Sequence, residues 1–171
     1  MNRVASLILA ILTLSSCIYD SPEGTDLKVG DTLPDFTVTM NDGTAVSSQM
    51  LKNTPSCVMF FHTSCPDCQK ALPVMQKIYD EYSSKGVQFA LISREEDGSS
   101  IASFWEAKGL TMRYSAQQTR EVYNLFAQTR VPRIYICEKG GIIRNIYTDD
   151  PVPGFEELDA RFSYVCGTDK E

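Results

Sequence analysis

The feature that most constrains the fold is a pair of cysteines, Cys65 and Cys68, at a junction between two sequence patterns. The run before them, residues 57–61, is apolar and rich in Val and Phe, as in a buried strand. The segment after them has apolar residues at helical spacing, and Pro66 stands where a first helical residue needs no N–H donor. The sequence therefore predicts a strand that delivers a thiol pair to the start of a helix.

This placement favours redox chemistry. At a helix N-terminus, unpaired N–H groups and the positive end of the helix dipole favour a thiolate at Cys65, and the thiolate is the nucleophile. Cys68, one turn further, can resolve a mixed disulfide. A zinc site needs a second pair or suitable histidines, whereas the other cysteines are isolated and His62 is the only histidine. A passive disulfide here closes too small a loop to constrain the unfolded chain. We therefore interpret the pair as redox-active and predict no metal site and no cofactor.

The N-terminus has the pattern of an export signal. Arg3 precedes an apolar run over residues 4–14 that is too short to span a bilayer as a stable anchor. The segment Leu14-Ser15-Ser16-Cys17 looks like a bacterial lipobox, which predicts a lipoprotein signal peptide over residues 1–16 and a lipid on Cys17. The alternative is an ordinary secretory signal cleaved nearby, with Cys17 left as an unpaired thiol.

The remaining chain suits one compact domain. Residues 17–28 carry turn formers and charges without periodicity, as expected of a tether, and we expect the domain over residues 29–168. With 16 Lys and Arg against 22 Asp and Glu, the net charge of −6 argues against nucleic acid as a partner. We expect a monomer in the periplasm, lipid-anchored to a membrane, where disulfides can persist and the pair can cycle.

Patterns along the domain predict alternating strands and helices. The apolar run over 87–92 is typical of a buried parallel strand, so it forms a right-handed βαβ unit with strand 57–61 and the helix between them. The other expected elements are a hairpin over 36–46, a short helix over 47–51, a helix ending at Gly109, a strand over 110–114, a helix from a capping box at 115–118 through 126, a hairpin over 133–147 and a terminal helix over 155–165.

This order of elements, with Pro73 in the helix and Val131-Pro132 before the last hairpin, resembles the thioredoxin fold. The segment 30–36 and an insert over about 93–128 narrow the resemblance to the TlpA/ResA-like branch of exported, membrane-tethered thiol-disulfide oxidoreductases. The match covers about 29–165. It implies an α/β fold with a central mixed sheet flanked by helices, an N-terminal hairpin, and a helical insert before a cis-proline loop.

The resemblance also implies roles for residues of this chain. Cys65 would attack a substrate disulfide and Cys68 would resolve it, while the cis-proline loop would face the pair. The implied substrate-binding residues are Val131, Pro132, Pro66 and Asp67. Partners would be cysteine-containing exported proteins and an upstream membrane electron donor, with the reductant direction favoured. Two alternatives stay open: a redox-inactive or metal-delivery module on this fold, and a thiol peroxidase.

The chain departs from the family pattern at the site. Relatives usually have Trp before the first cysteine, where this chain has Ser64. Relatives carry a buried carboxylate at one of two positions, occupied here by Met59 and Ala71, so the usual proton acceptor for the resolving thiol is absent from both. His62 is the local candidate for proton transfer, although it can equally be a surface or packed residue.

Two neighbouring families fit less well. A peroxiredoxin has Thr or Ser three residues before its peroxidatic cysteine, whereas Cys65 and Cys68 follow His62 and Cys65 at that spacing. Copper chaperones of the Sco type use Cys-x-x-x-Cys with a distant histidine, and this chain has neither feature. Peroxide reduction is thus the weaker alternative.

A last expectation concerns Cys57 and Cys137. Counting back from Cys65 and forward from Pro132 brings them to similar depth on strands that are antiparallel neighbours in a thioredoxin-like sheet. Directly opposed residues are close enough for a disulfide. The sequence therefore predicts that these cysteines face each other, as a second disulfide or a buried thiol pair.

Overall fold

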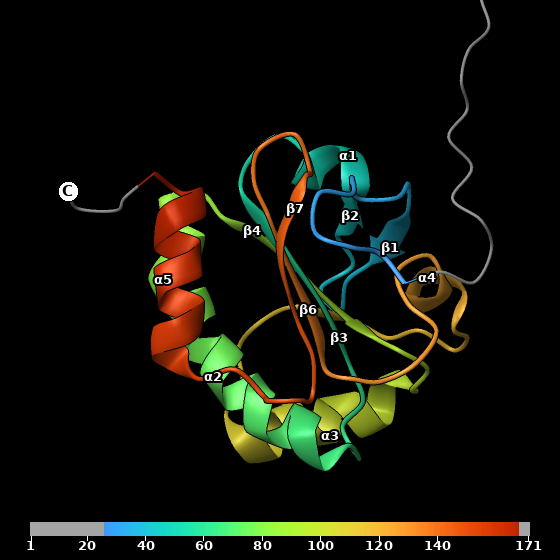
Figure 1. The fold of residues 1–171 in the computed structure, drawn as a ribbon. Helices are drawn as coiled ribbons and strands as arrows, with labels where there is room; N and C mark the ends of the chain where they lie inside the picture. The colour runs from blue at the N-terminus through green and yellow to red at the C-terminus, as the bar shows by residue number, and fades with distance from the viewer. Residues whose placement is uncertain (1–25, 168–171) are drawn as a thin grey trace, which may run out of the picture.

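A computed structural model describes residues 26–167 of the 171-residue chain (Figure 1). Its elements in chain order are β1 (Thr37–Thr39), β2 (Ala45–Ser47), α1 (Ser48–Leu51), β3 (Ser56–Phe61), α2 (Pro66–Tyr82), η1 (Ser83–Lys85), β4 (Gln88–Ser93), α3 (Gly98–Lys108), β5 (Tyr114–Ser115), α4 (Glu121–Asn124), β6 (Arg133–Cys137), β7 (Ile143–Tyr147) and α5 (Phe155–Val165).

The central sheet is mixed and has the strand order β5-β4-β3-β6-β7. Strand β3 lies in the middle, parallel to β4 and antiparallel to β6. Every residue of β3 is buried, which explains its continuous apolar run. The expected fold class, a central mixed sheet flanked by helices, is confirmed, and the strand that leads to the thiol pair is its central strand.

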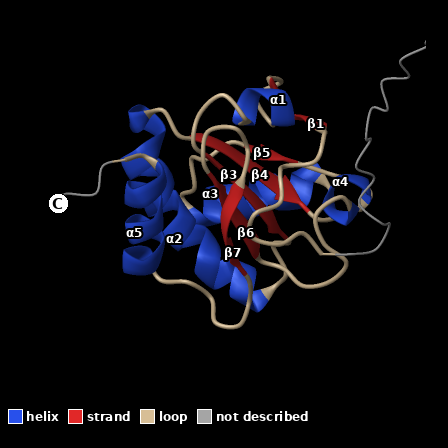
Figure 2. Cartoon of the chain, turned by 45° about the horizontal axis from the view of Figure 1, so that its top comes forward, coloured by secondary structure: helices blue, strands red, loops and turns tan. Residues whose placement is uncertain are grey.

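Two adjacent phenylalanines of β3 show how the layers pack. Phe60 contacts the rings of Tyr123 and Phe126, in and just after α4, at centroid distances of 5.3 and 4.8 Å. Phe61 contacts Trp105 of α3 at 5.0 Å. Because successive side chains of a strand point to opposite faces, α3 and α4 lie on opposite faces of the sheet. Figures 1 and 2 agree, with α2, α3 and α5 on one side and the β1–β2 hairpin, α1 and α4 on the other.

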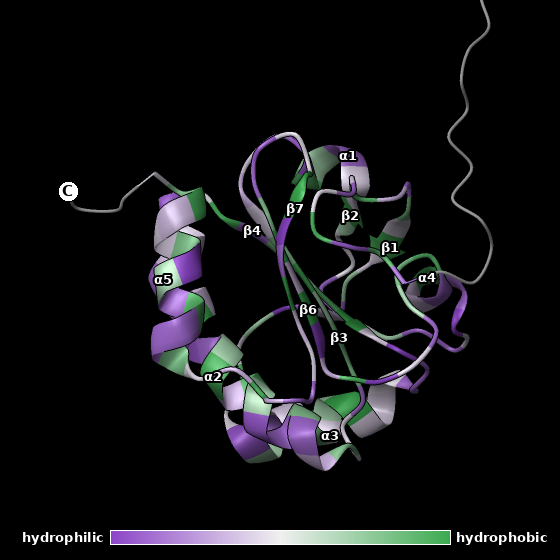
Figure 3. Cartoon of the chain, in the orientation of Figure 1, coloured by the Kyte–Doolittle hydropathy of each residue, from purple (hydrophilic) through white to green (hydrophobic). Residues whose placement is uncertain are grey.

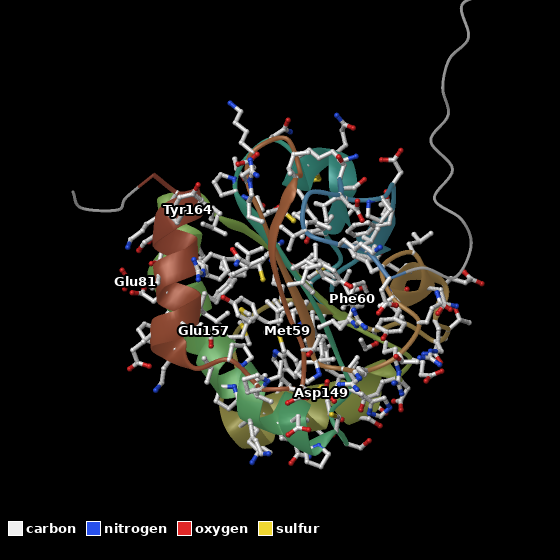
Figure 4. All side chains as sticks on the ribbon, in the orientation of Figure 1. Met59, Phe60, Glu81, Asp149, Glu157 and Tyr164 are labelled. Atoms are coloured by element: carbon white, nitrogen blue, oxygen red, sulfur yellow. The ribbon has the colours of Figure 1, made fainter. Side chains whose placement is uncertain are left out.

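Helix amphipathicity follows this arrangement. In Figure 3, α2, α3 and α5 each alternate between hydrophobic and hydrophilic residues, as expected of helices with one face on a sheet. Figure 4 places Met59 and Phe60 in the middle of the molecule, whereas Glu81, Glu157 and Tyr164 lie at its edge. The core therefore fills both faces of β3.

The N-terminal hairpin is a separate two-stranded sheet of β1 and β2. Its turn contains Gly43 at a φ of 82°, a conformation that favours glycine. The Asp42 side chain accepts hydrogen bonds from the backbone and hydroxyl of Thr44, at 2.9 and 2.6 Å. The expected hairpin is present because this turn closes locally.

The region before the cis-proline loop differs from the sequence prediction. The strand expected over 110–114 is shorter and shifted to β5, Tyr114–Ser115. The helix expected from Ser115 is reduced to α4, Glu121–Asn124, which has no side-chain cap. The reason is that the Ser115 hydroxyl donates to the carbonyl of Thr39 at 2.7 Å instead of capping a helix. A tertiary hydrogen bond thus overrides the capping-box pattern.

The last residues of the expected tether belong to the fold. Leu27 is buried, and its N–H donates to the carbonyl of Phe126 at 2.9 Å. Asp26 accepts from the N–H of Gln128 at 2.8 Å and pairs with the buried Arg133. The expected signal peptide, Cys17 and most of the tether lie outside the described residues. No helix within residues 26–167 is long and apolar enough to cross a bilayer.

Candidate active site

Cys65 caps the N-terminus of α2. Its backbone is extended, with φ −79° and ψ 120°, and Pro66 opens the helix as predicted. The Cys65 carbonyl accepts the N–H of Gln69 at 3.0 Å, while the Cys65 N–H donates to the carbonyl of His62 at 3.0 Å. The side chain of Cys65 is partly exposed. This thiol is therefore held at a helix start and open to other molecules.

Cys68 lies one turn further into α2 and is fully buried. Burial raises the pKa of the Cys68 thiol, since a thiolate there loses its hydration. The backbone N–H of His62 and the charge of Arg94 oppose that rise, whereas the hydrogen bond and charge of Cys65 add to it. The two cysteines are therefore neighbours in different environments, one partly exposed and one sheltered.

The loop before β6 completes the site. The Val131–Pro132 peptide bond is cis, and both residues are buried. The Cys65 thiol donates a hydrogen bond of 3.3 Å to the carbonyl of Val131. The loop and the helix start, 66 residues apart in sequence, thus meet at the exposed sulfur. Of the other two residues implied for substrate binding, Pro66 is exposed, and Asp67 is partly exposed and bonds Lys70 at 2.8 Å.

His62 directly follows β3, at the start of the short segment that leads into the thiol pair. Its Nδ1 is 2.9 Å from the Ser64 hydroxyl and accepts the Ser64 N–H at 3.2 Å. Acceptance of an N–H requires an unprotonated Nδ1, so a neutral ring here carries its proton on Nε2. The same Nδ1 lies 3.8 Å from Oε2 of Glu96. Glu96 is therefore a second neighbour of the His62 ring, beside Ser64.

Met59 and Ala71, at the two positions where relatives carry a carboxylate, are apolar and buried. Met59 is fully buried between Leu91 of β4 and Ile134 of β6, and Figure 4 shows it inside the molecule. Ala71 is 1% exposed. A proton acceptor for Cys68 must therefore come from another position.

Glu96 is the site residue that sequence reasoning missed. It accepts hydrogen bonds from the N–H of Thr63, at 2.9 Å, and from the Thr63 hydroxyl. Its side chain is only 6% exposed. Glu96 belongs to a run of charged residues after β4, and no local signal in the sequence connects residues that lie 33 positions apart. Both residues line a cleft of about 630 Å³ together with His62, Ser64, Glu95, Asp97, Ser100 and Gln118.

The prediction for Cys57 and Cys137 is wrong in register. Strands β3 and β6 are antiparallel neighbours as expected, but Cys57 is opposite Ile136 and Cys137 is opposite Ser56. Opposed residues share a face and successive residues alternate, so the two thiols point to opposite faces of the sheet. Both are free and fully buried, and burial raises the pKa of each. Within residues 26–167, no three His, Cys, Asp or Glu side chains gather as a metal-binding group.

Comparisons with known proteins agree with this geometry. The Redoxin family matches residues 28–161. The thiol-disulfide oxidoreductase ResA of Geobacillus kaustophilus (strain HTA426) is 26% identical over 148 residues, 85% of each chain. A solved thiol:disulfide interchange protein of the thioredoxin family from Chlorobium tepidum TLS has a TM-score of 0.70 at 21% identity, covering 84% of this chain and 100% of that one.

The fold alone does not separate exchange from peroxide chemistry. The peroxidoxin BcpB of Mycobacterium tuberculosis has a TM-score of 0.65 at 15% identity, over 85% of this chain and 99% of its own. The family match and the ResA relative confirm the expected TlpA/ResA likeness and the enzyme class, a thiol-disulfide oxidoreductase. Because the family match spans well over half of the 171 residues, the chain belongs to the Redoxin family.

Proposed function

We propose that this protein is exported, anchored through a lipid on Cys17, and reduces disulfides of other extracytoplasmic proteins. The observation that carries the exchange chemistry is the asymmetry of the pair: Cys65 is partly exposed beside the Val131 carbonyl, and Cys68 is sheltered behind it. Export and anchoring are proposed from the lipobox-like segment, and the reductive direction from the likeness to TlpA/ResA-like proteins.

The reaction proceeds in two exchanges. The Cys65 thiolate attacks one sulfur of a substrate disulfide, a bond forms between enzyme and substrate, and the other substrate sulfur leaves as a thiolate. Cys68 then loses its proton and attacks Cys65, which releases the second substrate sulfur. The substrate gains two electrons and two protons, and the enzyme is left with a Cys65–Cys68 disulfide. An upstream membrane dithiol donor reduces that disulfide for the next cycle.

Substrate recognition is proposed for the surface around Cys65. The Val131 carbonyl already accepts a hydrogen bond from the Cys65 thiol, so it faces the reacting sulfur. An extended substrate segment can pair with the backbone of this loop by β-augmentation. The exposed Pro66 and the partly exposed Asp67 border the same sulfur at the start of α2.

The exchange function is tested with a fluorescent peptide disulfide and the full chain. Cys65→Ser should abolish exchange, and Cys68→Ser should accumulate mixed disulfides. Cys166→Ser is the matched control, because Cys166 is also partly exposed but lies at the end of α5. Faster turnover of hydrogen peroxide than of the peptide disulfide would instead favour the peroxidase alternative.

Anchoring and direction need measurements in cells. Cys17→Ala should release the protein from the membrane fraction, and mass spectrometry of the wild type should find a lipid on Cys17. Rapid acid quenching followed by alkylation reports the state of the thiol pair. A mostly reduced pair, together with accumulation of substrate disulfides in a deletion strain, supports the reductive direction; a mostly oxidised pair contradicts it.

A further inference from the structure

A carboxylate outside the CxxC segment holds the backbone beside the thiol pair. Glu96 accepts two hydrogen bonds from Thr63, one from the N–H at 2.9 Å and one from the hydroxyl. The Glu96 side chain is only 6% exposed, so water competes little for its oxygens. Hydrogen bonds to an ionised carboxylate are about twice as strong as neutral ones. Thr63 is therefore fixed by both its main chain and its side chain.

The loop that carries Glu96 is itself anchored by backbone hydrogen bonds. The N–H of Arg94 donates to the carbonyl of Phe61 at 2.8 Å, which ties the Glu96 loop to the end of β3. The N–H of Glu96 donates to the carbonyl of Gln117 at 2.7 Å, which ties it to the segment after β5. The backbone around Glu96 is thus attached to the end of β3 and to the segment after β5, so its carboxylate holds Thr63 from a fixed position.

The segment that Glu96 holds carries backbone groups that contact the pair. The His62 carbonyl accepts the Cys65 N–H at 3.0 Å, and the Thr63 carbonyl accepts the Gln69 side chain at 2.8 Å. The backbone of His62 also lowers the pKa of the Cys68 thiol, against the larger effect of burial. A shift of the loop therefore changes the surroundings of both sulfurs.

We propose that Glu96 is a positioning residue for disulfide exchange, which holds Thr63 and so fixes the His62 backbone groups that contact the thiol pair. This inference rests on the proposed exchange by Cys65 and Cys68. Glu96 acts through hydrogen bonds to the loop and takes no part in the covalent steps. Its role extends to the second exchange, because the His62 carbonyl holds the N–H of Cys65, the residue that Cys68 attacks.

Nearby charges also act on Cys68, and their effect must be distinguished from the positioning role of Glu96. Arg94 lowers the pKa of Cys68 and Cys65 raises it, while the His62 ring lies 3.8 Å from Glu96. The charge of Glu96 and its hydrogen bonds are separated by two substitutions. Glu96→Gln removes the charge but keeps both bonds, since the amide oxygen accepts the Thr63 N–H and the amide nitrogen donates to the hydroxyl. Glu96→Ala removes both.

The test uses the full chain and measures the rate of the second exchange against pH, with the reduction potential and the melting temperature. Glu96→Ala should slow the second exchange about tenfold or more, because a displaced loop misaligns the reacting sulfurs. Its pH profile should also move upward, because a displaced His62 backbone no longer lowers the pKa of the Cys68 thiol. Glu96→Gln should stay within about threefold of the wild type.

Glu95→Ala is the matched control. Glu95 is the preceding carboxylate on the same loop, but its partners are Arg94 and Arg120, at 3.1 and 3.7 Å. This variant should leave the rate of the second exchange unchanged, and any move of its pH profile should be downward, because Arg94 loses a neutralising partner and lowers the pKa of Cys68 more strongly. If Glu96→Ala matches Glu95→Ala, the positioning role is refuted. If Glu96→Gln is as slow as Glu96→Ala, the charge and not the hydrogen bonding is responsible, and the proposal is equally overturned.

Two further measurements keep the test decisive. If Glu96→Ala does not fold, Thr63→Val removes only the hydroxyl bond; a rate loss of about threefold or more, with a raised pH profile, supports the role, and wild-type behaviour overturns it. Exchange that survives Cys65→Ser would refute the proposed function itself. That outcome is distinguishable because it does not depend on Glu96.

Discussion

Selective alkylation of the reduced protein examines the asymmetry on which the exchange function depends. Cys65 is partly exposed, whereas Cys68 is fully buried and burial raises the pKa of its thiol. Only the thiolate reacts with iodoacetamide. At pH 6.5 an ordinary thiol is about 1% thiolate, and each unit by which the pKa rises lowers that fraction tenfold. Restricted access to Cys68 slows its reaction further. We expect Cys65 to be labelled at least about a hundredfold faster than Cys68.

The assay must resolve several cysteines in one segment. Trypsin cleaves after Lys52 and Lys70, so Cys57, Cys65 and Cys68 occur in one peptide, and fragment ions assign the label. Quenching at a series of times gives the three rates. Cys65→Ser is the matched variant and should leave this peptide almost unlabelled over the same period. Labelling after denaturation shows that all of the thiols are reduced and detectable.

The same experiment can contradict the assignment of Cys65 as the attacking thiol and Cys68 as the resolving thiol. Cys68 labelled within about threefold of Cys65 means that burial neither shields that thiol nor suppresses its thiolate. Faster labelling of Cys68 would reverse the roles of attacking and resolving thiol. The trapping experiment should then also reverse, with mixed disulfides accumulating in Cys65→Ser.

Three other predictions concern neighbouring parts of the chain. Tyr82→Phe removes a buried hydroxyl that bonds Asp159 and should cost about 1–2 kcal/mol in urea unfolding. Burial raises the pKa of Tyr82 to about 12, so the wild type should also lose stability as pH rises from about 10 through 12, and the variant should lose less. Mass spectrometry after mild oxidation should find no disulfide between Cys57 and Cys137, since they point to opposite faces. His62→Asn should slow exchange near pH 7 about tenfold if the ring transfers protons, and an unchanged pH profile would make His62 structural.

Local chemistry determined the part of the site that lies in one segment. An apolar strand, a proline at the first helical position and two thiols one turn apart have their consequences within a few residues. The hairpin turn at Gly43 is similar, because a φ of 82° favours glycine whatever the surroundings. The meeting of Val131 and Pro132 with Cys65 followed from the family resemblance, and no local pattern predicts it.

Tertiary structure decided the rest. A one-residue difference in the register of β3 and β6 separates Cys57 and Cys137, and register depends on how both strands pack, which residue counting does not capture. The Ser115 hydroxyl bonds Thr39 instead of capping a helix, because a partner 76 residues away was available. Glu96 reaches Thr63 only because β3 and β4 are parallel neighbours whose ends lie together. Sequence determined the thiol pair and its strand and helix, whereas the folded chain decided which distant groups surround it.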